Sequence, residues 1–215
     1  MTFKFIDYAI PSCEQINNPT GRLYKTPDGN LYPSVTTVLG SIPSPELDAW
    51  KLAVGEAEAK KISKSATVRG EKIHKWCEDY LRGNDTKMPM LHREAYEMYL
   101  AMVPYLNKFS VIHALETRLW SDKLKVAGSV DCIAEIDGEV WVIDFKTSGR
   151  YKTIEEIHSY FMQTSAYAYM FWERTGIAIK KMRIIITTQD DGVLVYDELV
   201  KDWLPEFMKV RASFL

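Results

Sequence analysis

A short β-hairpin with acidic residues inside apolar strands is the feature that most constrains how this 215-residue chain folds. The pair Asp137-Gly138 is a two-residue turn signal, and it separates the apolar segments 130–136 and 139–145. Apolar segments on both sides of such a pair are typical of a tight antiparallel hairpin. The segment therefore predicts two neighbouring antiparallel strands.

The two-residue loop also fixes the predicted strand register. If Ile136 faces Glu139 across the turn, counting back along both strands places the other residues in pairs. Side chains alternate along a strand, so the aligned residues are expected on one face of the sheet. The pairs on that face are Glu135 with Val140, Ile133 with Val142, Asp131 with Asp144 and Ser129 with Lys146.

Two carboxylates directly opposite one another point to a metal site. The Cβ atoms of such a pair lie about 5 Å apart, and like charges at that distance destabilise a sheet. A divalent cation reverses this effect, because Mg²⁺ and Mn²⁺ prefer hard oxygen ligands and polarise a phosphoryl oxygen. Lys146 places an ammonium on the same face, two residues beyond Asp144. The alternative is an ordinary hairpin whose acids point to solvent.

Composition is ordinary for a soluble globular protein, with 47% hydrophobic and 26% charged residues. No apolar run is long enough to span a membrane, and the N-terminus lacks the apolar core of a secretory signal. We therefore expect a cytoplasmic protein with no membrane partner. Cys13, Cys77 and Cys132 are widely spaced, which indicates neither a disulfide framework nor a zinc ribbon. The net charge of −2 neither favours nor excludes nucleic acid.

The N-terminal part predicts a hairpin and short helices. A turn at residues 27–30 joins two short strands, and Ser34 is placed to cap a helix that stops at Gly40. Capping alone accounts for Ser34, Thr36 and Thr37, although hydroxyls and free N–H groups at a helix start also suit a phosphate.

Two longer helices are expected over residues 45–66 and 67–81, followed by another over residues 90–106. Between residues 51 and 75, lysine and arginine outnumber acidic residues seven to three. A solvated face explains any single lysine, whereas the excess as a group suits a nucleic-acid channel. His74 lies three residues before Cys77 on an apolar helix face, so it is expected to point inward as a core residue or as a ligand.

The pattern changes to strands from Val111 onward. Strands are expected over 111–121, 126–136, 140–147, 181–188 and 193–196, with helices over 154–174 and at the C-terminal end. The expected class is α/β, with a central mixed sheet flanked by helices. If the loop at 122–125 has four residues, Glu116 falls opposite Asp131; the alternative is an acid at the sheet edge.

An ordered set of motifs resembles a known nuclease family. The set consists of His74, Gly128-x-x-Asp131, Asp144-x-Lys146 and Gln163-x-x-x-Tyr167. It is similar to the RecB-type branch of the PD-(D/E)xK nuclease superfamily. The segments that resemble the mitochondrial genome maintenance exonuclease family and its phage relatives are Tyr32–Leu39, Trp50-Lys51, Arg69–His74 and Asp144–Ser148. The resemblance covers most of the chain from Tyr32 to about Tyr196.

This resemblance implies a restriction-endonuclease-like core that binds Mg²⁺ or Mn²⁺. The implied metal ligands are His74, Asp131, Asp144 and the carbonyl of Phe145, and Lys146 would position the attacking water or stabilise the transition state. The residues expected to contact nucleic acid are Ser34, Thr36, Arg69, Ser129, Thr147, Ser148, Arg150, Lys152, Gln163 and Tyr167. We expect residues 1–215 to form one nuclease domain, in which an N-terminal hairpin and helical region, 1–110, shapes the DNA channel and residues 111–215 form the catalytic core.

The chain departs from some members of the superfamily. Related helicase-nucleases and CRISPR-associated exonucleases hold an iron–sulfur cluster with four cysteines, three of them near the C-terminus. The last cysteine here is Cys132, so no iron–sulfur cluster is expected. The sequence also carries no ATPase loop.

The resulting hypothesis is a metal-dependent DNA exonuclease that prefers single-stranded ends and acts in replication, recombination or repair. One alternative is a structure-specific endonuclease on the same core. Another is a non-hydrolytic DNA-binding accessory protein for recombination. The expected partners are single-stranded DNA and a separate recombination or single-strand-binding protein. The resemblance to phage proteins also implies that this protein could be encoded by a phage and act in the host cytoplasm.

Overall fold

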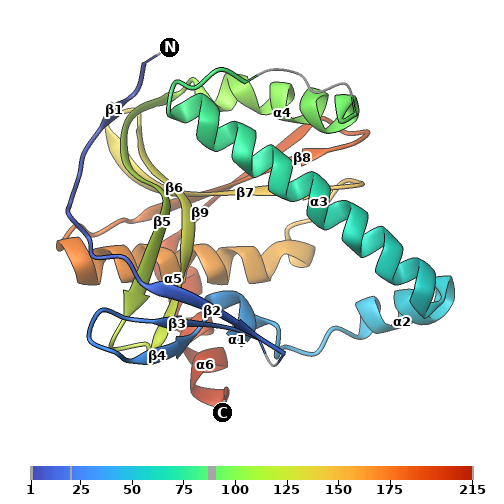
Figure 1. Ribbon diagram of the computed structural model, residues 1–215, viewed down its shortest axis with the longest axis horizontal. Coiled ribbons are helices and arrows are strands. Elements are labelled where there is room, and N and C mark those ends of the chain that lie inside the picture. Colours follow the sequence, from blue (N-terminus) through green and yellow to red (C-terminus); the bar gives the residue numbers. More distant parts are fainter. Residues whose placement is uncertain (1, 20, 87–90, 215) are drawn as a thin grey trace.

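Six strands form a mixed central sheet (Figure 1). The structure is a computed structural model that describes residues 2–19, 21–86 and 91–214. In the order in which they lie, the strands are β1 (Lys4–Phe5), β5 (Phe109–Ser121), β6 (Val126–Ile136), β7 (Glu139–Ser148), β8 (Lys181–Thr188) and β9 (Val193–Leu199). The β1–β5 and β7–β8 pairs are parallel, and the others are antiparallel.

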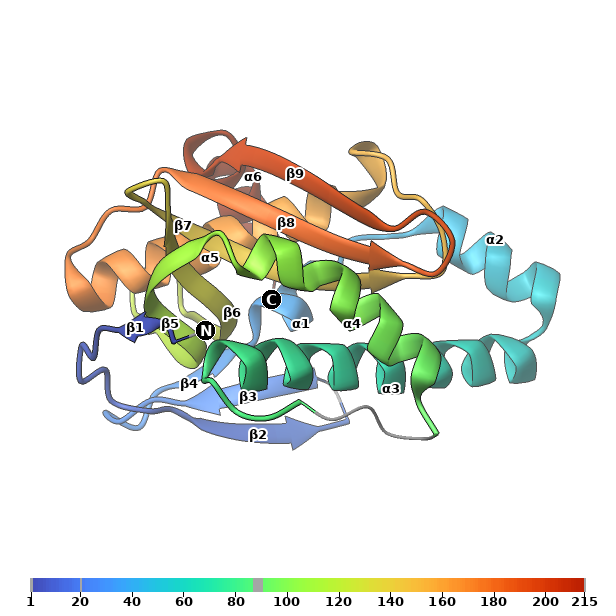
Figure 2. The same cartoon turned by 90° about the horizontal axis from the view of Figure 1, so that it is seen from above.

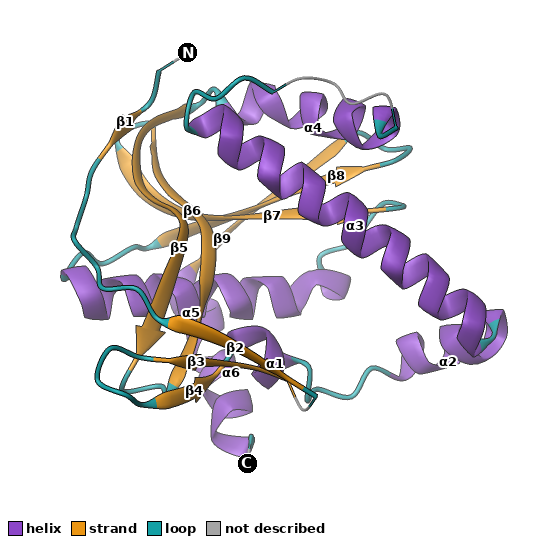
Figure 3. Cartoon of the chain, viewed as in Figure 1, coloured by secondary structure: helices purple, strands orange, loops and turns teal. Residues whose placement is uncertain are grey.

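Helices cover both faces of this sheet, above and below β7 in the view of Figure 3. On one side lie α3 (Glu56–Leu81) and α4 (Arg93–Leu106), and on the other lie α1 (Val35–Leu39), α5 (His158–Thr175) and α6 (Val200–Ser213). A 3₁₀ turn, Glu155–Ile157, precedes α5. This arrangement confirms the predicted α/β class with a central mixed sheet. No helix within the described ranges has the length and apolar character needed to cross a membrane.

Alternating side chains of the central strands feed two separate cores. Ile133 and Val142 pack with α5 residues such as Phe171, whereas Cys132 and Ile143 pack with α3 and α4. All four strand residues are fully buried. Because β6 and β7 are covered on both faces, most residues in their paired stretches, 132–136 and 139–143, are apolar, and a charged side chain within these strands is costly unless it is paired.

The predicted hairpin register is confirmed from the turn as far as the Cys132–Ile143 pair. Asp137 and Gly138 have φ values of 52° and 78°, as a type I′ turn requires. The described ladder then stops. Instead, the backbone N–H of Phe145 donates to Oδ2 of Asp131 at 2.8 Å. A side-chain carboxylate thus takes the place of a backbone acceptor, and the predicted Asp131–Asp144 and Ser129–Lys146 pairs are not part of the ladder.

The prediction of one common face also fails near Asp131. Val130 and Ile133, three positions apart, both belong to the core beneath α5, while Cys132 belongs to the opposite core. Strict alternation would put Val130 on the side of Cys132. The strand is therefore irregular at Asp131. Counting residues from the turn predicts the face of each side chain only as far as Cys132.

The conditional prediction for Glu116 is confirmed. Ser121 pairs with Val126 across a four-residue loop, and the β5–β6 register continues through the Thr117–Val130 and Leu115–Cys132 pairs. The count places Glu116 opposite Asp131. Glu116 has a left-handed backbone, with φ of 48°, which is uncommon for a residue other than glycine.

The helix boundaries near residue 66 were predicted wrongly. Gly55, with φ of 82°, separates α2 (Pro45–Val54) from α3, and α3 continues unbroken to Leu81. Gly55 can adopt this backbone without strain, whereas residues 56–66 contain no helix breaker. Figure 1 shows α3 running diagonally past the sheet, with α2 at its far end. The predicted start of the next helix at Met90 lies outside the described residues.

A second, three-stranded sheet precedes α1. It consists of β2 (Glu14–Asn18), β3 (Gly21–Lys25) and β4 (Leu31–Pro33). The β3–β4 hairpin follows the predicted turn, but β2 was not predicted. Figure 2 shows β2 and β3 along one side of α3, with β8 and β9 along the other. An isolated bridge between Ser34 and Ala127 joins the end of β4 to β6.

Gly128 allows α5 to approach β6 closely. A Cβ atom at this position would lie 2.8 Å from Cε1 of Tyr167 and 3.1 Å from its hydroxyl. Real Cβ atoms do not make contacts of 2.8 Å, so any larger residue would push the Tyr167 ring away. The Gly128-x-x-Asp131 motif therefore places an aromatic hydroxyl beside the strand that carries Asp131.

Gly128→Ala is expected to lower the free energy of unfolding by about 1–3 kcal/mol, because the added methyl overlaps the Tyr167 ring. In a Tyr167→Ala background the same change should cost much less, which a double-mutant cycle measures by chemical denaturation. Gly70→Ala is the matched control, since its Cβ would lie 3.4 Å from Oγ1 of Thr147 within helix α3 and alanine favours helices. Equal costs for both glycine substitutions would contradict this explanation.

Candidate active site

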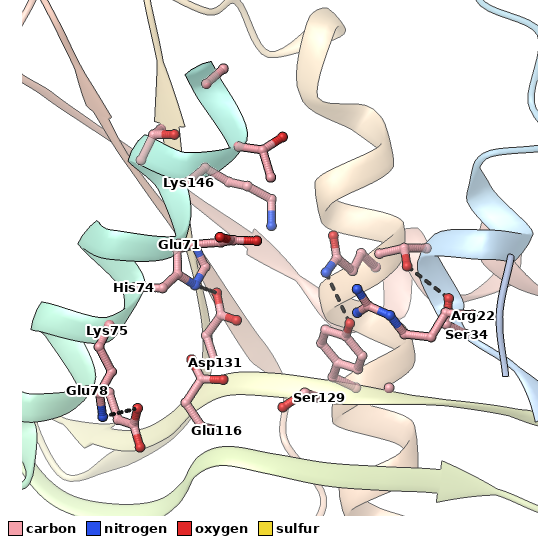
Figure 4. Close-up of a pocket in the computed structure, with 18 of the residues that line it drawn as sticks. Arg22, Ser34, Glu71, His74, Lys75, Glu78, Glu116, Ser129, Asp131 and Lys146 are labelled. Carbon is pink, nitrogen blue, oxygen red and sulfur yellow. Dashed lines mark hydrogen bonds and ion pairs between the residues drawn. The ribbon is translucent and has the colours of Figure 1, made fainter. Parts of the chain in front are cut away.

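A cleft of about 690 Å³ lies where α3, the central strands, α5 and the N-terminal sheet meet. Residues from α3 form one wall, and Figure 4 shows Glu71, His74 and Lys75 projecting from it. Arg22 and Ser34 lie on the opposite side of the cleft in this view. The irregular parts of β5 and β6 form the floor with Glu116 and Asp131.

Most of the residues predicted for the site line this cleft. From the predicted catalytic set, the lining includes His74, Asp131 and Lys146. From the predicted nucleic-acid contacts, it includes Ser34, Thr36, Ser129, Thr147, Gln163 and Tyr167. These residues come from five elements or their flanks, so the fold joins positions that are far apart in the chain.

Other predicted residues lie elsewhere. Asp144 and Phe145 are buried, with 1% of each exposed, and neither lines the cleft. Arg69 lines a different depression, between α3 and the start of α4. The Ser148 hydroxyl accepts a hydrogen bond from the N–H of Arg150.

Arg150 and Lys152 both pair with Glu156, which lowers the pKa of that carboxyl to about 2. The structure therefore does not bring Arg69, Ser148, Arg150 or Lys152 into the cleft.

His74 and Asp131 form an ion pair at the floor of the cleft, with Nδ1 and Oδ2 3.5 Å apart. Burial lowers the pKa of His74, but the Asp131 carboxylate outweighs it and raises this pKa to about 9. Burial raises the pKa of Asp131, whereas His74 lowers it further, so that the net direction is downward. At neutral pH the metal-free pair is thus imidazolium and carboxylate.

Asp144 lies behind this pair and contacts Nζ of Lys146. That contact is to Oδ2, whereas Oδ1 of Asp144 has no hydrogen-bond partner within the described part of the chain. Burial raises the pKa of Asp144 more than the Lys146 ammonium lowers it. Buried carboxylate oxygens without hydrogen-bond donors are rare and need an explanation.

Glu116 joins His74 and Asp131 in a cluster of possible ligands. One nitrogen or oxygen atom from each of the three residues lies within 4.8 Å of those of the other two. The pKa of Glu116 is raised to about 7, mainly by burial and to a lesser extent by the negative charge of Asp131. The strand register predicted the position of Glu116 but did not distinguish a ligand from an edge acid.

The donor set fits a divalent cation. Carboxylate oxygens from Glu116 and Asp131 and an imidazole nitrogen from His74 are suitable ligands for a metal of the Mg²⁺ to Mn²⁺ type. A bound cation would lower the raised pKa values of Glu116 and Asp144, because it favours the charged forms of both carboxyl groups. The buried Oδ1 of Asp144, which has no hydrogen-bond donor among the described residues, supports the same assignment.

The cleft also contains residues that sequence analysis did not identify. Glu71, Lys75 and Glu78 line the α3 wall. Glu71 and Glu78 are three and four residues from His74, so helical spacing was an available signal for these two; Lys75 directly follows His74. Arg22 lies on β3, and nothing in the sequence placed that strand beside the cleft.

Comparisons with known proteins identify relatives. A sequence model of the PD-(D/E)XK nuclease superfamily matches residues 48–199. Mitochondrial genome maintenance exonuclease 1 of Homo sapiens is 30% identical over 132 residues, covering 57% of this chain and 38% of that protein. The protein of that name from Mus musculus is 29% identical over 133 residues, covering 58% and 39%. The matched region is thus less than half of these relatives.

Among solved structures, the crystal structure of SSO0001 is similar, with a TM-score of 0.44 and 16% sequence identity. The match covers 84% of this chain and 73% of that one.

The pKa values predict that the metal-free protein loses stability as pH rises from about 5 to 9. Glu116 has a folded pKa of about 7 against an ordinary value of 4.5, and His74 one of about 9 against 6.5. A raised folded pKa means that the folded state binds more protons than the unfolded state within each interval. Stability present at low pH is therefore lost as pH rises through the folded value.

Thermal unfolding in chelator, measured from pH 5 to 9, checks this expectation. Glu116→Gln should reduce the slope of the curve below about pH 7, since the amide does not titrate, and the remaining slope there comes from Asp144, whose pKa is raised to about 6. Glu156→Gln is the matched control, because the pKa of Glu156 is about 2 and its titration is complete below this range. A melting temperature that rises steadily with pH would contradict the assigned directions.

Proposed function

Because the chain belongs to the PD-(D/E)XK nuclease superfamily, we propose that its cleft hydrolyses phosphodiester bonds of DNA with Mg²⁺ or Mn²⁺. The observation that carries this proposal is the cluster of His74, Glu116 and Asp131, with the Asp144–Lys146 pair directly beside it. A binding protein has no need of this constellation, because several buried ionisable groups in one cleft are costly to maintain.

His74, Glu116 and Asp131 are the proposed residues that hold the cation, with Asp144 behind them. When bound, Mg²⁺ or Mn²⁺ supplies Lewis acidity toward a phosphoryl oxygen and a source of hydroxide at neutral pH. Asp131 is held in place by the N–H of Phe145. The carbonyl of Phe145 is proposed from family resemblance as a further ligand, and it belongs to the residue whose N–H holds Asp131.

Lys146 is proposed to stabilise charge on the reacting phosphate or to orient the attacking water. Its side chain is 19% exposed, so Nζ reaches from the buried Asp144 toward the cleft. Burial lowers the pKa of Lys146, but Asp144 and Asp131 raise it beyond that effect. The amine therefore stays protonated at neutral pH and acts as a hydrogen-bond donor and cation, not as a general base.

Gln163 and Tyr167 are proposed to contact the DNA strand from α5. The amide nitrogen of Gln163 donates to the Tyr167 hydroxyl at 3.0 Å, which fixes both side chains relative to each other. Ser129, Thr36 and Thr147 add neutral hydroxyls to the lining. Hydroxyl and amide groups of this kind contact phosphate and sugar without reading sequence.

A single-stranded substrate is proposed from the family resemblance. A cleft of about 690 Å³ is within the range of small-ligand pockets, which is in keeping with a few nucleotides of one strand. Exonuclease action is proposed from the names of the relatives, with a role in DNA replication, recombination or repair. Residues 1–110 would shape the DNA channel, and residues 111–215 would supply most of the catalytic core.

Cleavage of labelled single-stranded DNA with Mg²⁺ or Mn²⁺ tests the proposal. Chelator should abolish cleavage, and Asp131→Asn or Lys146→Ala should reduce the rate constant about a hundredfold or more. Glu135→Gln and Lys181→Ala are matched controls on β6 and β8, outside the cleft. A circular single strand should remain intact.

Undiminished activity in chelator, or in both site variants, would rule out this mechanism. Cleavage of the circular strand would instead identify an endonuclease on the same core. DNA binding without cleavage under any divalent metal would favour the accessory-protein hypothesis.

A further inference from the structure

Arg22 is an exposed arginine on the wall of the cleft formed by the N-terminal sheet. It lies on β3, outside the segment 48–199 that matches the nuclease superfamily. Figure 4 shows its side chain on the side of the cleft opposite His74 and Asp131. The proposed metal ligands and Arg22 therefore face the same space from two directions.

The other cations that line the cleft already have carboxylate partners. Lys75 lies 3.1 Å from both Glu78 and Asp79, and Lys146 contacts Asp144. The guanidinium of Arg22 makes neither a hydrogen bond nor an ion pair with any residue in the ranges 2–19, 21–86 and 91–214. It is thus the uncompensated cation of this lining, and it is available to an anion from outside the chain.

The backbone of Arg22 is held firmly, although its guanidinium has no partner among the described residues. Its N–H donates to Oγ1 of Thr37 at 3.0 Å, and its carbonyl accepts from the same hydroxyl at 3.2 Å and from the N–H of Ser34 at 2.8 Å. Thr37 belongs to α1, whose Val35 and Val38 are fully buried in the core beneath α5. The sheet wall is therefore anchored to the part of the protein that carries the floor of the cleft.

We propose that Arg22 binds a backbone phosphate of the DNA strand and holds it across the cleft from His74 and Asp131. This inference rests on the proposed nuclease function and assigns the N-terminal sheet a positioning role in it. Guanidinium groups suit phosphate because two N–H donors match two phosphate oxygens. A contact of this kind fixes the register of the strand without selecting its sequence.

The chain offers a matched control on the same strand. Lys25 is also exposed and lies three residues from Arg22 on β3. Because side chains alternate, Arg22 shares its face with Tyr24, which lines the cleft, whereas Lys25 points to the other face. Arg22→Ala and Lys25→Ala remove the same charge from opposite faces of one strand.

Fluorescence anisotropy with a labelled single-stranded oligonucleotide in chelator measures the contact without cleavage. Arg22→Ala should weaken binding roughly tenfold and make the dependence of log K on log salt shallower by about 0.7, the value for one phosphate contact on a single strand. Lys25→Ala should change neither. Arg22→Lys should keep the salt dependence but bind more weakly than wild type, because lysine retains the charge and lacks the paired N–H donors of the guanidinium.

A neutral methylphosphonate oligonucleotide distinguishes a phosphate contact from a structural effect, since wild type and Arg22→Ala should bind it equally. Equal binding of the natural strand by wild type, Arg22→Ala and Lys25→Ala would overturn the inference, and so would a tenfold difference that persists on the methylphosphonate strand. Failure of the nuclease function itself is separable. It would appear as a wild-type chain that cleaves no DNA with any divalent metal.

Discussion

The hydrogen bond from the N–H of Phe145 to the carboxylate of Asp131 is the constraint on which the site depends. It forms where the β6–β7 ladder stops, and it holds a charged group within a sheet that is covered on both faces. His74 approaches the same carboxylate from α3, and Asp144 lies behind it with Lys146. Such a group of charges is unfavourable in isolation, and the proposed divalent cation would compensate it.

The surrounding fold serves to bring separate elements to this point. The break at Gly55 frees α3 to run straight past the sheet and deliver His74. The absence of a side chain at Gly128 lets Tyr167 of α5 approach β6. The N-terminal sheet is joined to β6 through the bridge between Ser34 and Ala127, and it contributes Arg22 from outside the segment that matches the nuclease superfamily.

Sequence reasoning succeeded where local rules decide and failed where tertiary contacts decide. Asp137-Gly138 fixed the hairpin register as far as Cys132, and a four-residue loop placed Glu116 opposite Asp131. The register beyond Cys132 could not be predicted, because a side chain takes over a backbone hydrogen bond there. Arg22 was missed for another reason. A strand residue carries no signal for a site until the position of its sheet is known.

Calorimetric titration of Mn²⁺ and Mg²⁺ into the protein at neutral pH tests the metal site most directly, with Asp131→Asn as the decisive variant. Asparagine can still accept the hydrogen bond from Phe145, so it removes the charge without removing the contact that shapes the strand. The wild-type protein should bind the metal and release protons, because His74 and Glu116 must lose them. Asp131→Asn should bind at least about tenfold more weakly. Equal affinity for both proteins would contradict the assignment of Asp131 as the central ligand.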